Sequence, residues 1–294
     1  MPLIDAHHHV WDPAVREQPW ITGEEMAPLR RAFTPDDLRA VTRAAGIDAT
    51  VVVQTVTEPT ETPELLALAA AGPSIAGVVG WTDLVAPDVT DRIAALRAAP
   101  GGDRLVGIRS QVQAVRDPRD LLGPSADRGR AALVAHGLVH ELVITSEQLP
   151  EVVEAAERAP APTLVLDHLG KPPIAGGDPE RFRAWSAGLR RLAALPHTVA
   201  KVSGLVTEAD HRRWTGADLR PFVETALEAF GPDRLMFGTD WPVCLLAADH
   251  RTVLETTRRL LAPLAEGERA AVLGGTALRV YGLRPHHSPG ITAS

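Results

Sequence analysis

The sequence predicts a single (β/α)8 barrel with a long lid loop after its first strand and extra helices at its C-terminal end. Short apolar runs alternate with helix-like segments along 294 residues, and polar side chains recur where the runs end. The runs are apolar throughout, as strands buried on both faces of a parallel sheet are. The length fits one barrel of about 250 residues with additions. We assign the barrel to residues 1–283 and expect residues 284–294, with His286 and His287, to form a flexible tail.

The expected strands cover residues 3–10, 49–55, 75–82, 105–112, 138–144, 163–168, 198–204 and 234–240. Helices are expected over residues 35–45, 63–70, 89–98, 128–135, 148–157, 179–194 and 219–230, and then over 251–261 and 266–272. The first helix has a typical start, because the capping residue Thr34 precedes a proline at the first helical position. Residues 11–33 form the lid loop. An open doubly wound sheet is the rival fold, but no Gly-x-Gly-x-x-Gly motif follows a strand.

The composition is that of a mildly acidic globular protein. Asp and Glu outnumber Lys and Arg by 37 to 30, the formal net charge is −7, and no basic stripe is present. A nucleic-acid partner is therefore not expected. The single cysteine, Cys244, fits a reducing compartment. We find no signal sequence and no apolar run near the ~18 residues of a membrane span, so we expect a cytoplasmic protein without a membrane partner. Whether it forms a homo-oligomer stays open.

Three consecutive histidines, His7, His8 and His9, lie in the first expected strand. Because side chains alternate between the faces of a strand, His7 and His9 project together and His8 points away. Two imidazoles on one face can ligate a metal ion or hold a substrate. A tag remnant or a hydrogen-bonded core histidine is the alternative. The triplet lies within the strand and is followed at once by a turn, which favours a functional pair.

Active sites of (β/α)8 barrels lie at the C-terminal ends of the strands. Polar or aromatic residues end most of the expected strands in this sequence: His7 and His9, then Gln54, Trp81, Arg109 with Gln111, His168, Ser203 and Asp240. Each has a structural alternative: Asp240 could cap a turn, Arg109 could pair with a carboxylate inside the barrel, and His168 could be a core residue. Together they predict one site. His140 and Glu141 are adjacent on the fifth strand and must face opposite ways; their role stays open.

Four segments resemble one family. Residues 5–11 (DAHHHVW), 107–109 (GIR), 167–172 (DHLGKP) and 236–242 (MFGTDWP) are similar to the lactonase branch of the amidohydrolase superfamily. That branch includes the L-fuconolactonase, L-rhamnonolactonase and 2-pyrone-4,6-dicarboxylate lactonase types. The segments occur in order from the first strand to the eighth and are specific as a set. The His-x-His pair and the last-strand aspartate alone would indicate only the wider superfamily.

The resemblance implies a hydrolase that opens the ester bond of a lactone, with His7, His9 and Asp240 around a metal and His168 as the sixth-strand histidine. The strand-four lysine of many superfamily members is not matched, since Arg109 stands there. We therefore expect one divalent metal ion and not two. Zinc is the first choice, because two imidazoles and a carboxylate suit it and leave a position for water. Some relatives of this branch work without metal, so metal-independent catalysis remains an alternative.

Lactone hydrolysis gives the catalytic candidates their roles. Asp240 would take a proton from water and pass it to the leaving oxygen. His168 would donate to the developing oxyanion or orient the water, and Arg109 would present a planar fork to substrate oxygens. The expected substrate contacts are Gln54, Gln111, Lys171, Trp11, Trp81 and Trp241.

Tryptophan faces beside hydrogen-bonding groups suit a sugar ring, so a sugar-acid (aldono-) lactone is the expected small-molecule substrate. A lactone with several carboxylates would need more cations than Arg109 and Lys171. The alternatives are a non-oxidative decarboxylase of the same superfamily, a TatD-like nuclease, against which the acidic charge argues, and a non-catalytic binding barrel.

Overall fold

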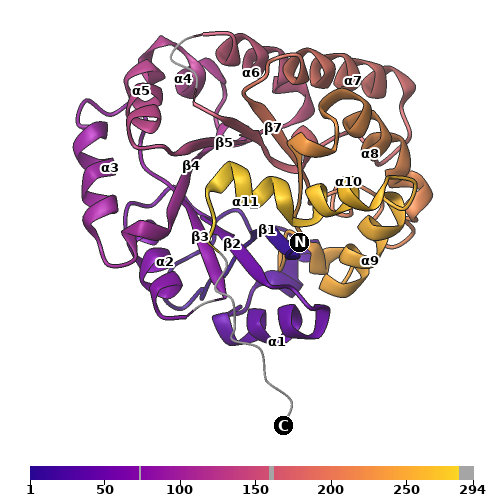
Figure 1. Ribbon diagram of the computed structural model, residues 1–294, viewed down its shortest axis with the longest axis horizontal. Coiled ribbons are helices and arrows are strands. Elements are labelled where there is room, and N and C mark those ends of the chain that lie inside the picture. Colours follow the sequence, from indigo (N-terminus) through magenta and orange to yellow (C-terminus); the bar gives the residue numbers. More distant parts are fainter. Residues whose placement is uncertain (73, 159–161, 285–294) are drawn as a thin grey trace.

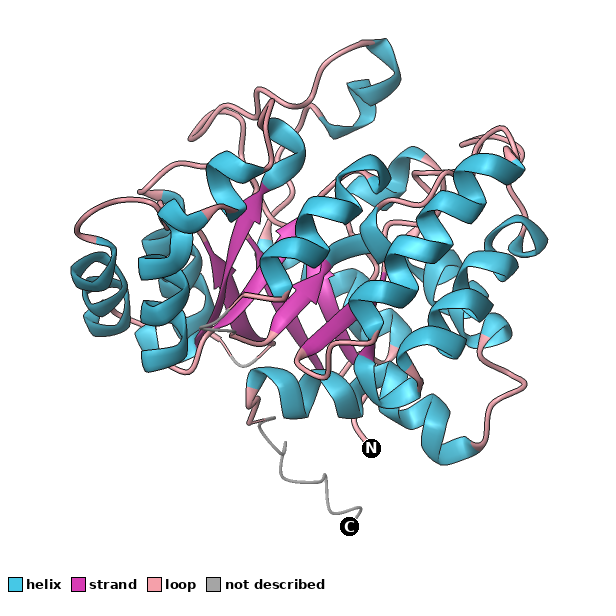
Figure 2. Cartoon of the chain, turned by 90° about the horizontal axis from the view of Figure 1, so that it is seen from above, coloured by secondary structure: helices cyan, strands magenta, loops and turns pink. Residues whose placement is uncertain are grey.

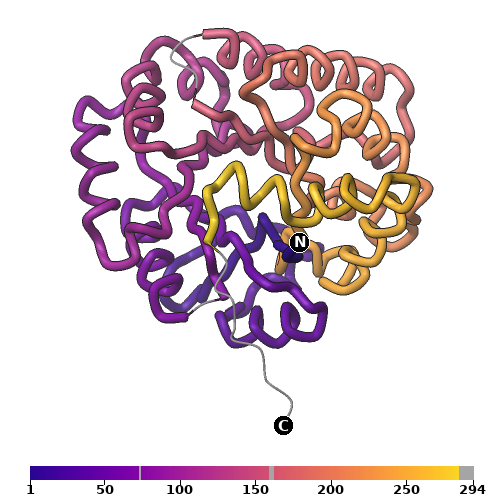
Figure 3. The backbone as a smooth tube through the Cα atoms, viewed as in Figure 1, coloured from indigo at the N-terminus to yellow at the C-terminus, as the bar shows by residue number. Residues whose placement is uncertain are grey.

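The computed structural model describes residues 1–72, 74–158 and 162–284, and it confirms the (β/α)8 barrel. Eight parallel strands pair in sequence order, and Figure 3 shows the chain passing around the ring in that order. The sheet closes where His8 bridges Trp241. There the His9 N–H donates to the Trp241 carbonyl at 2.7 Å, and the Asp240 N–H donates to the His7 carbonyl at 2.8 Å. The expected tail, with His286 and His287, lies outside the described residues from position 285 onward.

Every expected strand and helix is present, with ends that shift by a few residues. The strands are β1 (Ile4–His8), β2 (Ala49–Val53), β3 (Ile75–Gly80), β4 (Leu105–Gln111), β5 (Val139–Val143), β6 (Leu164–Leu166), β7 (Thr198–Val202) and β8 (Leu235–Phe237). The helices that follow them are α1 (Pro35–Ala45), α2 (Glu61–Ala70), α3 (Val89–Ala98), α5 (Asp127–Ala135), α6 (Leu149–Ala156), α7 (Pro179–Ala193), α8 (Gly216–Phe230), α9 (His250–Leu260) and α10 (Glu266–Ala270). The short helices α4 (Arg119–Leu122) and α11 (Thr276–Tyr281) were not predicted.

Local chemistry explains the ends of α1. Thr34 and Asp37 form a capping box, in which each side chain accepts a hydrogen bond from the other residue's backbone N–H. Gly46 ends the helix in the left-handed region at φ 69°, where glycine avoids the steric cost that a side chain brings.

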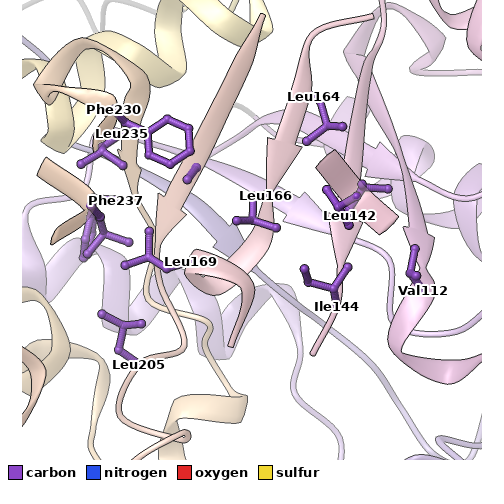
Figure 4. Close-up of a cluster of buried hydrophobic side chains, with 14 of the residues drawn as sticks. Val112, Leu142, Ile144, Leu164, Leu166, Leu169, Leu205, Phe230, Leu235 and Phe237 are labelled. Carbon is purple, nitrogen blue, oxygen red and sulfur yellow. The ribbon is translucent and has the colours of Figure 1, made fainter. Parts of the chain in front are cut away.

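Two apolar layers hold the barrel. The inner layer consists mainly of small and branched side chains of the strands, and Tyr281 and Leu283 join it from the C-terminal end of the chain. In Figure 1, α11 lies across one mouth of the barrel beside the N-terminus. The outer layer lies between the strands and the helices, and Figure 4 shows part of it around Leu142, Leu166 and Phe237. Figure 2 shows the strands pointing away from the mouth with α11, so the C-terminal strand ends face the opposite mouth.

The lid loop after β1 is ordered by its own contacts. Trp11 and Phe33, near its two ends, exchange backbone hydrogen bonds of 3.1 and 2.8 Å. Between them lies the 3-10 helix η1 (Glu24–Leu29), which packs against the turn η8 (Val243–Leu246) after β8. The lid is thus fixed above the barrel mouth. Within the described part of the chain, the helices lack the length and apolarity that a membrane crossing requires.

Candidate active site

A cavity of about 330 Å³ opens at the C-terminal end of the barrel. Six residues predicted from strand ends and motifs line it: His9, Arg109, Gln111, His168, Lys171 and Asp240. The lid contributes Trp20, Glu25 and Met26, and the segment after β7 contributes Thr207, Glu208 and His211. The strand ends therefore do converge on one site, and the lid closes one side of it.

His7, His9 and Asp240 form a buried cluster at the base of this cavity. The Nε2 atoms of His7 and His9 lie 3.2 Å apart. The Asp240 Oδ1 atom lies 3.7 Å from the first and 3.4 Å from the second. These atoms are close enough together to hold one metal ion, and two imidazoles with a carboxylate are a donor set that suits zinc. The side chains fit the single divalent ion predicted from the sequence.

The histidine triplet alternates as expected. The Nδ1 atom of His9 donates to the Val53 carbonyl at 2.7 Å, which turns Nε2 toward the cluster. His8 points the other way, and its Nε2 lies 2.9 Å from the Thr50 hydroxyl. Burial lowers the pKa of His8 to about 4, so His8 is a neutral structural residue at neutral pH.

Asp5 fixes the backbone on either side of Asp240. Its carboxylate accepts hydrogen bonds from the Thr239 N–H at 2.9 Å and from the Thr239 hydroxyl. That hydroxyl oxygen accepts from the Trp241 N–H at 3.2 Å. Asp240 itself adopts φ 58°, a left-handed conformation that Asp and Asn tolerate better than most residues. Asp5, the first residue of the first motif, is therefore a structural support for the backbone that carries Asp240.

His168 lies in a tight turn after β6, in which His168 and Leu169 have φ values of 54° and 52°. Its Nδ1 atom is 2.9 Å from the Ser203 hydroxyl, and burial lowers its pKa to about 4. A Cβ atom at Gly204 would lie 2.6 Å from His168 Nδ1, so glycine leaves room for the ring. His168 is thus a neutral imidazole held against Ser203 at the cavity wall.

A network of buried charges lies beneath the cavity. Lys201 Nζ is 2.6 Å from Glu141 Oε2, 3.2 Å from Asp167 Oδ1 and 3.2 Å from His7 Nδ1. The Tyr281 hydroxyl donates to the other oxygen of Glu141. Arg109 Nη1 lies 3.2 Å from Asp167 Oδ2. The two cations, Lys201 and Arg109, are therefore paired with the two carboxylates, Glu141 and Asp167. Unpaired charges at this depth would cost several kcal/mol each.

The pKa values of the two carboxylates in this network are shifted in opposite directions. Burial raises the pKa of Glu141 to about 7 against the opposing charge of Lys201. Burial also opposes ionisation of Asp167, but the charges of Lys201 and Arg109 hold the pKa of Asp167 well below its usual range. Asp167 is therefore the firmly ionised carboxylate next to His7. Burial in turn lowers the pKa of His7 well below its ordinary value, so His7 is neutral.

Sequence reasoning did not assign Lys201 a role. The signal was present, since Val199, Lys201 and Ser203 have the same phase on the seventh strand, and a lysine in an apolar run is costly unless paired. The partners Glu141 and Asp167 come from β5 and the end of β6. Glu141 therefore has a structural role as a partner of Lys201.

Arg109 is less free than the sequence suggested. Besides Asp167, its guanidinium donates to the Gln54 backbone carbonyl and, at 3.1 Å, to Gln54 Oε1. Gln54 Oε1 also accepts from Gln111 Nε2 at 2.9 Å. The alternative of a pairing inside the barrel therefore describes Arg109 well. Arg109 lines the cavity, but both of its terminal nitrogens contact protein groups, and the Gln54 side chain accepts hydrogen bonds from both Arg109 and Gln111.

The three tryptophans expected to contact substrate are not among the residues that line this cavity. Trp11 packs on Trp20 and Phe33 and donates to the Leu29 carbonyl at 3.2 Å. Trp241 is buried against Phe33, and Trp81 lines a separate hollow with residues of α2 and α3. The folded lid buries Trp11 as core, and Trp20 takes its place at the cavity.

His140 lies on the opposite face of β5 from Glu141, as alternation requires. Its Nε2 atom is 2.9 Å from the Ser110 hydroxyl. Burial, helped by the charge of Arg130, lowers the pKa of His140 to about 3. His140 is therefore a neutral structural residue away from the cavity.

We expect His140 to make the protein sensitive to acid. An unfolded histidine titrates near pH 6.5, so below that pH the unfolded chain takes up a proton that folded His140 cannot. The free energy of unfolding should therefore fall from pH 6.5 toward pH 3, by about 1.4 kcal/mol per pH unit from this group. Urea unfolding of His140→Gln should show a flatter dependence between pH 6.5 and 4.5. Equal slopes in the two proteins would contradict this.

Comparisons with known proteins agree with the fold and the cluster. The amidohydrolase family model matches residues 4–283. An L-fucono-1,5-lactonase from Burkholderia multivorans is 45% identical over 95% of this chain and 96% of its own. Another, from Burkholderia ambifaria, is 36% identical over 95% and 94%. The crystal structure of a Burkholderia multivorans amidohydrolase with bound zinc has a TM-score of 0.90 and 43% identity, covering 97% of this chain and 100% of that one.

A barrel with a His-x-His pair on its first strand and an aspartate after its last, converging on one cavity, defines a hydrolase site of the amidohydrolase type. The chain belongs to the amidohydrolase family, which confirms the resemblance inferred from the four sequence segments.

Proposed function

We propose that the protein hydrolyses the ester bond of a sugar-acid lactone, and that an aldono-1,5-lactone of the L-fucono type is the first candidate. The observation that carries this proposal is the convergence of His7, His9 and Asp240 beneath a mixed polar and apolar cavity. The two relatives named as L-fucono-1,5-lactonases support the choice of sugar.

Asp240 is the proton carrier in the proposed reaction. Its carboxylate faces His7 and His9 and lines the cavity, so it can take a proton from an attacking water and return it to the ring oxygen that leaves. His168, neutral and held by Ser203, can orient that water or donate to the developing oxyanion. A divalent ion held by His7, His9 and Asp240 would polarise the carbonyl and lower the pKa of a water.

The sugar hydroxyls would be held by polar side chains that line the cavity. Lys171 Nζ lies 3.8 Å from Glu208 Oε1, and both side chains line the cavity with Gln111. Burial raises the pKa of Glu208, and a cation beside a carboxyl offers a donor and an acceptor for neighbouring hydroxyls. Trp20 and Met26 supply apolar surface from the lid. Trp20 is therefore the tryptophan that we propose to stack on the sugar ring, in place of the role expected for Trp11, Trp81 and Trp241.

We expect turnover on aldonolactones that falls when metal is removed. A pH-indicator assay on a panel of 1,4- and 1,5-aldonolactones should show hydrolysis, and chelation followed by zinc should abolish and restore it. Metal content is quantified on the same samples. Hydrolysis that survives complete chelation would assign the chemistry to Asp240 and His168 without an ion. Silence on the whole panel, with CO2 released from hydroxybenzoates, would replace the proposal with the decarboxylase alternative.

A further inference from the structure

The hydrogen bonds around His9 determine which ring nitrogen of His7 carries the proton. His9 Nδ1 must donate, because its partner at 2.7 Å is the Val53 carbonyl. When Nδ1 carries the only proton of the ring, the Nε2 atom is an acceptor. The His7 Nε2 atom, 3.2 Å away, must therefore be the donor. Neutral His7 has one ring proton, so its Nδ1 atom is bare in this arrangement.

Two groups of opposite character compete for that Nδ1 atom. Lys201 Nζ lies 3.2 Å from it and Asp167 Oδ1 lies 3.3 Å from it. An ammonium group can only donate and a carboxylate can only accept. The Lys201 ammonium can therefore donate to Nδ1 only when that atom is bare, whereas the Asp167 carboxylate can accept from Nδ1 only when that atom is protonated. The arrangement is that of His7 protonated on Nε2.

A metal ion in the cluster requires the other tautomer. A histidine binds through a bare nitrogen and donates its second ring N–H to a carboxylate or carbonyl. His9 already meets this condition through Val53. For His7 to bind through Nε2, its proton must move to Nδ1 and be donated to Asp167. Lys201, as a cation facing the same atom, opposes that change.

We propose that Asp167 and Lys201 are positioning residues that compete for Nδ1 of His7 and thereby set the affinity of the site for a divalent ion. Asp167 favours the metal-binding tautomer and Lys201 favours the tautomer that donates from Nε2 into the cluster. The proton is transferred within one imidazole, and none is exchanged on balance. The inference rests on the proposed function only through the choice of His7 and His9 as ligands.

Nitrogen NMR of the wild-type protein tests the two tautomers directly. With 15N-labelled histidine, and with His7 assigned by the loss of its signals in His7→Gln, the metal-free protein should show His7 protonated on Nε2. Adding zinc alone should move the proton to Nδ1. A metal-free protein that already carries the proton on Nδ1 would overturn the proposal. This measurement needs no variant with an altered charge network.

Zinc affinity, measured by titration with a competing chelator, tests the two residues separately. Asp167→Asn should weaken zinc binding by roughly 10–100-fold, the range found when outer-shell partners of ligands are removed. Glu141→Gln is the matched control, because it makes the same carboxylate-to-amide change on the other carboxylate partner of Lys201. In the described part of the chain Glu141 makes no hydrogen bond or ion pair with His7, so this variant should change zinc affinity much less.

The converse variant removes the competing cation. Lys201→Met combined with Glu141→Gln should bind zinc on the order of tenfold more tightly than Glu141→Gln alone, since a positive charge next to a ligand is gone. Equal effects of Asp167→Asn and Glu141→Gln, or weaker binding in the double variant, would contradict the proposal. Neither measurement uses a lactone, so silence on every lactone would overturn the proposed function and leave this test intact.

Discussion

Asp240→Asn is expected to fold like the wild-type protein and to lose lactone hydrolysis by about 10²–10⁴-fold in kcat, the usual contribution of a general acid–base group. An amide cannot take the proton from the attacking water or return it to the leaving oxygen. The fold should survive because Asn tolerates the left-handed conformation that Asp240 adopts at φ 58°. The clamp from Asp5 acts on Thr239 and is untouched by the change.

The measurement is the rate of proton release on the best lactone of the panel, together with thermal unfolding of both proteins. Asp178→Asn is the control, because it makes the same chemical change at the exposed cap of α7 and should leave kcat as in the wild type. Wild-type-like turnover by Asp240→Asn would remove Asp240 from the proposed mechanism. A large loss of thermal stability would show that Asp240 is mainly structural.

Lys201→Met is expected to lower the free energy of unfolding by about 3–5 kcal/mol, the cost of removing one partner of a buried ion pair. Lys201 is fully buried, and Glu141 and Asp167 would lose the ammonium group that lies 2.6 and 3.2 Å away. Adding Glu141→Gln should recover part of the loss, because Glu141 is the carboxylate left without a cation, whereas Asp167 keeps Arg109. Urea unfolding followed by circular dichroism measures both variants.

Lys171→Met serves as the comparison for that experiment. Lys171 is partly exposed and lies 3.8 Å from Glu208, so the same substitution there should cost about 1 kcal/mol or less. If Lys201→Met proved as mild as Lys171→Met, the charge network would not be a determinant of stability.

The barrel, the polar rim and the grouping of His7 and His9 with Asp240 could be predicted from the sequence, because these features depend on local patterns. Apolar runs with helices between them define strands buried on both faces. Alternation along a strand put His7 and His9 on one face and His8 on the other, as the structure confirms. Parallel strands end at one mouth, so Asp240 was expected beside them although it lies more than two hundred positions away.

Strand pattern does not specify which side chains meet inside the barrel or which ones the lid buries. Lys201, Glu141 and Asp167 lie on different strands or strand ends, and their pairing depends on how those strands are staggered around the closed sheet. Closure of the sheet also brings Asp167 and Gln54 into contact with the guanidinium of Arg109. Burial of Trp11 follows from the path of the lid. A buried charge is stable only with its partners in place, and strand pattern alone does not specify those partners.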